Sequence, residues 1–300
     1  MAARWAKLGT WAALVATLGI TSAGCAADTD DTDDGTQGDD MEVIARDPAS
    51  MPKPILTFLN NEGWGKHHLE WHTIRQWDLL SGEEQTWAKK QHWARADIQE
   101  GTKGNGLEFL AMHRVMIRKL VDKFPGNADL FKGFDQPPLE CSDKADPCGP
   151  EMPGPFDANK AKAIDKLQNH LADFRSDDEL GLFLETSLRP TSAKPDARSS
   201  DKSAGIHNYL HGRFMDSKSK IDVGDPSVNL QNKKFWRIHG WIENRWTEFR
   251  RLKKMSDKDP AYEAAISKAE RMFQGGLKAP PGGANEPPPP SLLKRFFKEP

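Results

Sequence analysis

The sequence predicts an all-α fold, a helix bundle with long irregular loops. Three observations lead to this class. Apolar residues recur mostly at helical spacing, strand signals are scarce, and Pro, Gly and Ser gather between the periodic segments. The 300-residue chain is long enough to bury a sizeable core, and we expect the helical domain to span residues 51–275.

The expected helices follow one another along the chain. Ser81 and Glu84 form a capping-box-like start, and the helix that begins there is expected to run towards Trp93. The further predicted helices cover residues 107–124, 158–174, 203–214, 233–252 and 261–273. Residues 133–157 are rich in Pro, Gly and Cys, so we expect a loop there.

The N-terminus is typical of an export signal. Arg4 and Lys7 precede a short apolar run, which is too short to span a bilayer. Residues 1–24 resemble a bacterial lipoprotein signal, which makes Cys25 the lipidated residue, and ordinary cleavage near Ala26 is the alternative. The resemblance implies an exported protein, lipid-anchored to the bacterial outer membrane and facing either the periplasm or the surface.

An acidic segment follows the signal. Residues 25–50 contain a run of Asp with Thr, Gly and Gln, and we expect a disordered tether, with calcium binding as the weaker alternative. The net charge of the whole chain is −2, which argues against a nucleic-acid binder held by a broad basic surface.

Two cysteines remain once Cys25 is assigned to the anchor. An even number in an oxidising compartment predicts a local disulfide between Cys141 and Cys148.

Three histidines fall on predicted buried helix faces. His207 and His211 are four residues apart and project from one face, and His239 lies on the inward stripe of the next long helix. Three neutral imidazoles from two packed helices suit copper or zinc, whereas three hydrogen-bonded core histidines are the alternative. Asn208 stands where a His-Glu-x-x-His zinc protease needs its Glu, so that class is disfavoured.

The chain around these histidines resembles the tyrosinase family. Its second copper motif has two His separated by three residues, then Asp-Pro, then Phe and a His pair, then Asp and Trp. The corresponding residues here are His207, His211, Asp225, Pro226, Phe235, His239, Glu243 and Trp246, and Ile238 replaces the first His of the pair. Residues 106–114, GLEFLAMHR, resemble the end of the first copper motif. The resemblance spans roughly residues 80–255 and implies a tyrosinase-like di-copper fold.

The resemblance implies a set of copper ligands. His207, His211 and His239 would bind the second copper, and His113 together with His92 would bind the first. In that family a copper pair uses dioxygen to oxidise phenols or catechols. A phenolic small molecule and dioxygen are therefore the implied partners, and copper is the implied cofactor.

Other motif residues receive supporting roles from the same resemblance. Phe109 and Phe235 would pack against the ligand rings, and Glu243 and Arg245 would form a structural ion pair. Asn208 would be catalytic, because family members that hydroxylate monophenols use this Asn and an upstream Glu to hold a water.

No Glu precedes Asn208 in residues 198–201. Asp196 and Asp201 are the candidates for that water site, although we favour a surface position for both.

The first copper motif departs from the family pattern. Its middle ligand would lie nine residues before His113, where this chain has Gly104. His67, His68 or His72 offers a substitute, but we favour exposed or Trp-stacked surface positions for that cluster.

Three functions remain in competition. The first is a copper oxidase of phenols or catechols. The second is a non-catalytic or mononuclear metal-binding tyrosinase-like surface lipoprotein, and the third is a structural helical lipoprotein.

The last segment, residues 276–300, is a Pro/Gly-rich basic tail. Leu292, Leu293, Phe296 and Phe297 could dock into a groove over the copper site, as in some relatives, but we favour a loose tail or a membrane-surface contact.

Overall fold

The chain folds into a helical bundle. The computed structural model describes residues 35–185, 201–274 and 286–293, and within these ranges it contains many helices and no β-strand. An isolated antiparallel bridge joins Ser50 to Asn232. The predicted all-α class is confirmed. Among the described helices, none has both the length and the apolar character that crossing a membrane requires.

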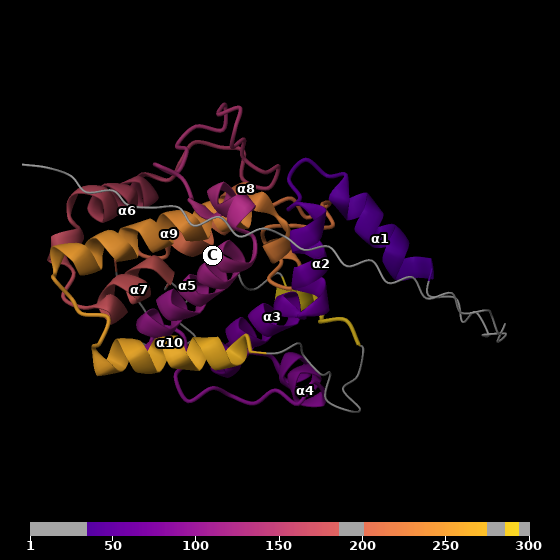
Figure 1. The fold of residues 1–300 in the computed structure, drawn as a ribbon, viewed down its shortest axis with the longest axis horizontal. Helices are drawn as coiled ribbons and strands as arrows, with labels where there is room; N and C mark the ends of the chain where they lie inside the picture. The colour runs from indigo at the N-terminus through magenta and orange to yellow at the C-terminus, as the bar shows by residue number, and fades with distance from the viewer. Residues whose placement is uncertain (1–34, 186–200, 275–285, 294–300) are drawn as a thin grey trace, which may run out of the picture.

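A central helix, α5 (Asn105–Lys123), organises the bundle (Figure 1). It packs against α7 (Asp177–Glu185), α9 (Lys233–Leu252) and α10 (Pro260–Met272). Most of its residues are buried, as expected for a helix covered on several sides. Helices α5 and α7 approach closely at a pair of glycines: a Cβ on Gly106 would lie 2.1 Å from the Asp178 carbonyl oxygen.

The remaining helices surround this core. They are α1 (Gly35–Ala45), α2 (Lys53–Asn61), α3 (Trp64–Arg75), α4 (Gly82–Lys90), α6 (Ala158–Asn169), α8 (Ile206–Phe214) and α11 (Pro290–Leu293), with the 3₁₀ turns η1 (Trp77–Leu79), η2 (Pro125–Phe131), η3 (Leu171–Asp173) and η5 (Asn229–Gln231). The predicted helices correspond to α4, α5, α6, α8, α9 and α10, whereas the sequence did not predict α1, α2, α3, α7 and α11. The Ser81–Glu84 capping box is present, but α4 ends at Lys90 rather than continuing to Trp93.

The N-terminal expectations meet the structure only in part. The export signal and Cys25 lie outside the described residues. The prediction of a disordered segment is wrong for residues 35–50, because α1 forms there and Met51 N–H donates to the Gln231 carbonyl. The cause is a short apolar stretch after the Asp run: Met41 and Ile44 pack against the core.

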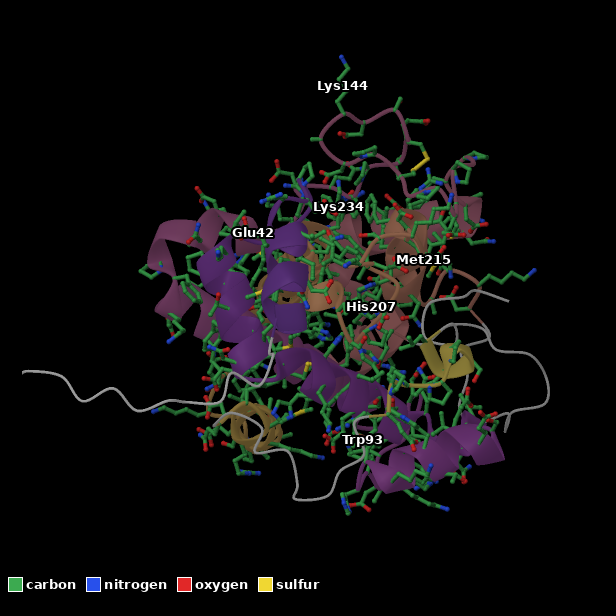
Figure 2. All side chains as sticks on the ribbon, turned by 90° about the vertical axis from the view of Figure 1, so that its right-hand side faces the viewer. Glu42, Trp93, Lys144, His207, Met215 and Lys234 are labelled. Atoms are coloured by element: carbon green, nitrogen blue, oxygen red, sulfur yellow. A yellow bond between two sulfur atoms is a disulfide. The ribbon has the colours of Figure 1, made fainter. Side chains whose placement is uncertain are left out.

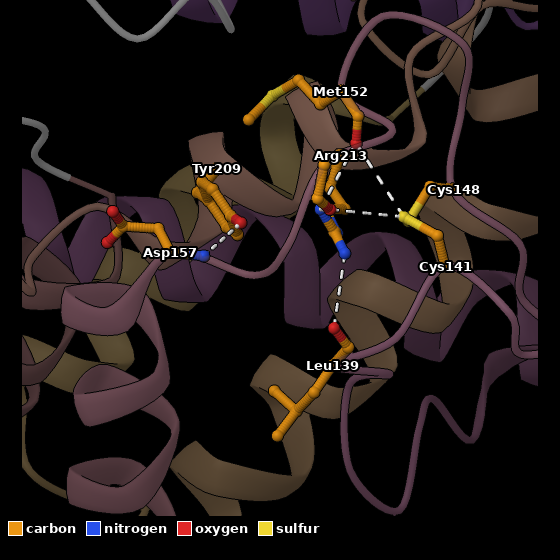
Figure 3. Close-up of a disulfide and its surroundings, with 8 residues drawn as sticks. Leu139, Cys141, Cys148, Met152, Asp157, Tyr209 and Arg213 are labelled. Carbon is orange, nitrogen blue, oxygen red and sulfur yellow. Dashed lines mark hydrogen bonds between the residues drawn. A yellow bond between two sulfur atoms is a disulfide. The ribbon is translucent and has the colours of Figure 1, made fainter.

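The predicted disulfide between Cys141 and Cys148 is present, with an S–S distance of 2.05 Å (Figure 3). Arg213 of α8 holds the surrounding loop to the bundle. Its guanidinium donates to the carbonyl oxygens of Met152, Gly154 and Leu139. This loop therefore braces the helix that carries His207 and His211.

Part of the C-terminal tail is docked. Leu292 is fully buried in a small cluster with Leu69, Trp77, Leu80, Trp87, Ala88 and Trp93. The Trp87 indole donates to the Glu286 carbonyl at 3.2 Å, and Lys90 forms an ion pair with the Glu286 carboxylate. The favoured loose tail is thus wrong for residues 286–293, while Phe296 and Phe297 lie outside the described residues.

We expect Leu292→Ala to release this segment. Removing a fully buried Leu side chain costs about 2–5 kcal/mol, which is enough to undo a contact of only eight residues. Limited proteolysis should then cleave between residues 286 and 293 much faster than in the wild type. Leu252→Ala is the matched control, because Leu252 is 45% exposed. Equal cleavage rates in both variants would contradict the docked segment.

Candidate metal centre

Six histidines from four helices meet inside the bundle. They are His68 and His72 of α3, His113 of α5, His207 and His211 of α8, and His239 of α9, and each is at most 3% exposed. Figure 2 shows His207 in the interior of the molecule, between the helices. Burial of this many imidazoles without a cation is costly, because each ring has two polar nitrogens to satisfy.

The six rings form two neighbouring groups. The ring nitrogens of His68, His72 and His113 lie within 4.8 Å of one another, and so do those of His113, His207 and His239. The His211 ring centroid lies 4.6 Å from that of His207 and 5.3 Å from that of His239, so His211 belongs beside the second group. These two groups could each hold a metal ion.

The same local pattern builds both groups. One helix carries two His four residues apart: His68 and His72 on α3, and His207 and His211 on α8. Such a spacing places both side chains on one helix face. The next contributor is a Phe followed four residues later by a His, Phe109 to His113 on α5 and Phe235 to His239 on α9.

Hydrogen bonds fix the orientation of the rings. Five Nδ1 atoms lie against oxygen acceptors: His68 against Pro226 O (3.0 Å), His113 against Phe109 O (2.9 Å), His211 against Val223 O (2.7 Å), His239 against Phe235 O (2.8 Å) and His207 against Asn208 Oδ1 (2.9 Å). A carbonyl oxygen only accepts, so each of these Nδ1 atoms carries the proton and donates it. In the neutral ring, Nε2 then carries the lone pair that a metal binds.

The positions of the inward nitrogens are compatible with a bound cation. His207 Nε2 and His239 Nε2 are 3.1 Å apart, and both rings have their proton on Nδ1. Two lone pairs at that distance form no hydrogen bond, whereas a cation between them would satisfy both. His113 Nε2 is also buried, and no hydrogen-bond partner for it lies among the described residues.

The electrostatics keep the rings neutral. Burial lowers the pKa of His68 to about 4 and that of His211 to about 3. Burial, followed by repulsion from neighbouring imidazoles, also holds the pKa values of His72, His207 and His239 well below the ordinary 6.5. Neutral imidazole is the metal-binding form, so the site is ready for a metal at neutral pH.

Two phenylalanines pack the ligand rings, as the sequence predicted. Phe235 stacks on His239 with 3.8 Å between the ring centroids, and Phe109 lies 4.7 Å from His113 and 4.8 Å from His207. Since rings held on both sides lose their rotamer freedom, these contacts preorganise the nitrogens.

One loop serves both groups. The carbonyl of Val223 orients His211, and that of Pro226, in the Asp-Pro motif, orients His68. Helix α3 reaches this loop only because residue 65 is glycine, since a Cβ there would lie 2.1 Å from the Ser227 carbonyl oxygen.

We therefore expect Gly65→Ala to weaken the first group without removing a ligand. The new methyl group must push α3 away from Ser227, which lengthens the hydrogen bond from His68 to Pro226. Loss of such an orienting contact typically costs about 10- to 100-fold in metal affinity. Chelator competition measures this loss. Gly82→Ala is the control, because its Cβ would meet nothing within 4 Å; equal losses in both variants would contradict the argument.

Asn208 lies beside the second group. Its side-chain nitrogen donates to the Glu185 carbonyl at 3.1 Å, and its oxygen faces His207 Nδ1. Glu185 is 2% exposed, and its carboxylate accepts from Asn105. Glu185, at the end of α7, thus meets Asn208 through its backbone carbonyl, while its carboxylate bonds Asn105. Asp201 instead caps a turn at Ser203, and Asp196 lies outside the described residues.

The predicted ion pair has a different partner. Glu243 accepts two hydrogen bonds from Arg114 Nε, at 2.8 and 2.9 Å, rather than pairing with Arg245. Arg114 follows His113 and also stacks on Trp246, with its guanidinium carbon 3.6 Å from the ring centroid. This network ties α5 to α9, which together carry one ligand of each group.

The first group corrects two sequence-based expectations. His92 is exposed, two residues beyond the end of α4 in a left-handed turn with φ 61°, and it belongs to neither group. His68 and His72 are buried and join His113, so the favoured surface interpretation is wrong for these two. His67 is half-buried and packs edge-on against Phe273.

A signal for the α3 ligands was present in the sequence. The spacing of His68 and His72 equals that of His207 and His211. It was missed because α3 was not predicted as a helix.

Comparison with models of known protein families gives no match, and comparison with curated proteins gives none either.

Proposed function

We propose that the protein is a copper-dependent oxidoreductase that oxidises phenols or catechols with dioxygen, in the manner of tyrosinases and catechol oxidases. The observation that carries the proposal is the pair of adjacent all-histidine groups, in the second of which the Nε2 lone pairs of His207 and His239 face one another. Two groups, rather than one, favour this reading over a mononuclear metal-binding protein.

The donor set favours copper. Imidazole suits copper, zinc, iron and nickel, and copper binds most tightly among the divalent ions of the first transition row. Di-iron centres in helix bundles use Glu carboxylates, whereas the two groups here contain only histidines among the described residues. Bound copper would supply the electron transfer between the substrate and dioxygen; two catechols give two quinones while one dioxygen becomes two waters.

The chain's own residues would hold the copper, orient the histidine rings and keep them rigid. The outward Nδ1–H bonds fix the rings of His68, His113, His207, His211 and His239, and Phe109 and Phe235 limit ring motion. Asn208, oriented by its bond to Glu185, would hold a hydrogen-bonding group or water beside His207. These contacts make the site rigid before any substrate binds.

The test combines metal content with turnover. The protein from about residue 41 onwards is loaded with copper, dialysed, and assayed for copper per chain and for oxygen uptake with a catechol. We expect about two copper ions and uptake that both His113→Ala and His207→Ala abolish. Copper without uptake would support a non-catalytic metal-binding protein, and uptake that is unchanged in both variants would overturn the proposal. Zinc loading without copper is the control and should give no uptake.

Export and lipid anchoring at Cys25 belong to the same proposal. The disulfide between Cys141 and Cys148 supports an oxidising compartment. Mass analysis of the mature N-terminus tests it, since an unmodified Cys25 would contradict the anchor.

A further inference from the structure

A pocket lies beside the first histidine group, beyond Trp71. It has a volume of about 620 Å³ and is formed by α3, α5, α10 and residues 94–97. None of the six buried histidines lines it. Trp71 stands between the two sites, because it lines the pocket and its ring centroid lies 4.9 Å from that of His72. Binding sites for small molecules commonly have volumes of this size.

The lining of this pocket is largely apolar. The apolar side chains come from three helices: Trp71, Ile74, Met112, Ala265, Ala269 and Met272. An apolar floor of this kind suits a flat aromatic ligand, and the half-buried Met272 thioether can adapt to a ring edge. Trp71 is 3% exposed and the Arg75 guanidinium carbon lies 4.2 Å from its ring centroid, so Trp71 closes the floor rather than offering a free face.

Charged side chains line the pocket from α3, α5 and α10. Lys268 and Arg271 lie three residues apart on α10, hence on neighbouring positions of one helix face. Lys268 and Arg75 both form an ion pair with the Glu108 carboxylate, so one negative charge is shared by two positive charges. Arg271 has no ion pair within the described parts of the chain.

The α3 side contributes an acceptor. Glu70 lines the pocket and is half-buried, and none of the described residues donates a hydrogen bond to its carboxylate. The pocket therefore offers an incompletely paired cationic side on α10, an apolar floor and an acceptor on α3. An anionic group of a ligand suits the cationic side on α10, and a hydrogen-bond donor suits the acceptor on α3.

We propose that this pocket is a separate binding site for a small hydroxylated aromatic acid. The ring packs on the apolar floor against Met272, the carboxylate binds Lys268 and Arg271, and the hydroxyl donates to Glu70. Binding at this site needs no metal, so the proposal can be tested independently of the copper chemistry proposed above.

The test is calorimetric titration of the metal-free full chain, kept in EDTA, with 4-hydroxyphenylacetate. We expect saturable binding with one site per chain. The double reversal Lys268→Glu, Arg271→Glu should weaken it at least about tenfold, because it removes both partners of the carboxylate. Both residues are exposed on α10, so the fold should persist, and circular dichroism checks this. Lys254→Glu, Lys258→Glu is the matched control and should bind as the wild type.

Two analogues sharpen the result. Tyrosol, which carries an alcohol in place of the carboxylate, should bind at least about tenfold more weakly, and phenylacetate, which lacks the hydroxyl, should also lose affinity. His207→Ala should bind 4-hydroxyphenylacetate unchanged, which separates this site from the metal centre. No measurable binding, equal binding of tyrosol, or an unaffected double-reversal variant would each overturn the proposal.

Discussion

Replacing His68 and His72 together by alanine is expected to lower the copper bound per chain from about two ions to about one, and to abolish oxygen uptake. Both side chains are buried in the first group, and without them only His113 remains there. A lone imidazole holds copper weakly, because each lost ligand removes a bond that the buried pocket cannot replace with water. His207, His211 and His239 keep their hydrogen bonds, so the second group retains its three nitrogens.

The matched control removes two histidines from the same regions of sequence. His67→Ala, His92→Ala changes one exposed and one half-buried residue, neither of which belongs to a histidine group. It should bind as much copper as the wild type and keep its oxygen uptake. The assignment of α3 to the first group would be wrong if this control lost a copper ion, or if the His68, His72 variant kept two.

The sequence predicted the second group well because its helices have visible signals. Helix α9 alternates polar and apolar residues at helical spacing, so the inward position of His239 could be inferred, and the spacing of His207 and His211 places them on one face. Packing then brings α8 and α9 together, and the His207 and His239 nitrogens meet at 3.1 Å.

The first group could not be completed in the same way. Helix α3 is buried on several faces: Trp64, His68, Leu69, Trp71, His72, Thr73 and Arg75 are all buried. A helix covered this widely has no polar stripe, and periodicity then gives no signal. His92 was placed on α4, but the helix ends at Lys90, and helix ends are the least certain part of such predictions.

Glu185 was missed for a different reason. It lies 23 residues before Asn208, at the end of an unpredicted helix, and only the packing of α7 against α8 brings the two together. The pairing of Arg114 with Glu243 is likewise tertiary, since 129 residues separate them. Contacts of this kind follow from the arrangement of helices and not from any local pattern.

Acidification is expected to destabilise the metal-free protein steeply below pH 6.5. A histidine in the unfolded chain has a pKa near 6.5, whereas burial lowers the pKa of His68 to about 4. Between these values the unfolded chain binds a proton that the folded protein does not, so the free energy of unfolding falls as the pH falls. Each such histidine contributes about 1.4 kcal/mol per pH unit, and His68 alone about 3 kcal/mol across its window. This loss of stability is absent above pH 6.5 and complete below about pH 4.

Urea unfolding of metal-free protein at intervals from pH 8 to pH 4.5 measures this dependence, and variants isolate it from the carboxylates. The stability difference between wild type and His68→Gln should shrink by about 1.4 kcal/mol per pH unit below 6.5, because glutamine does not titrate. Leu252→Ala, at an exposed residue that does not titrate, should differ from the wild type by the same amount at every pH. A pH-independent difference for His68→Gln would show that this ring is not buried in its neutral form.

Bound copper should make the free energy of unfolding depend more steeply on pH, because protons compete with the metal for the same nitrogens. Copper release should therefore follow acidification.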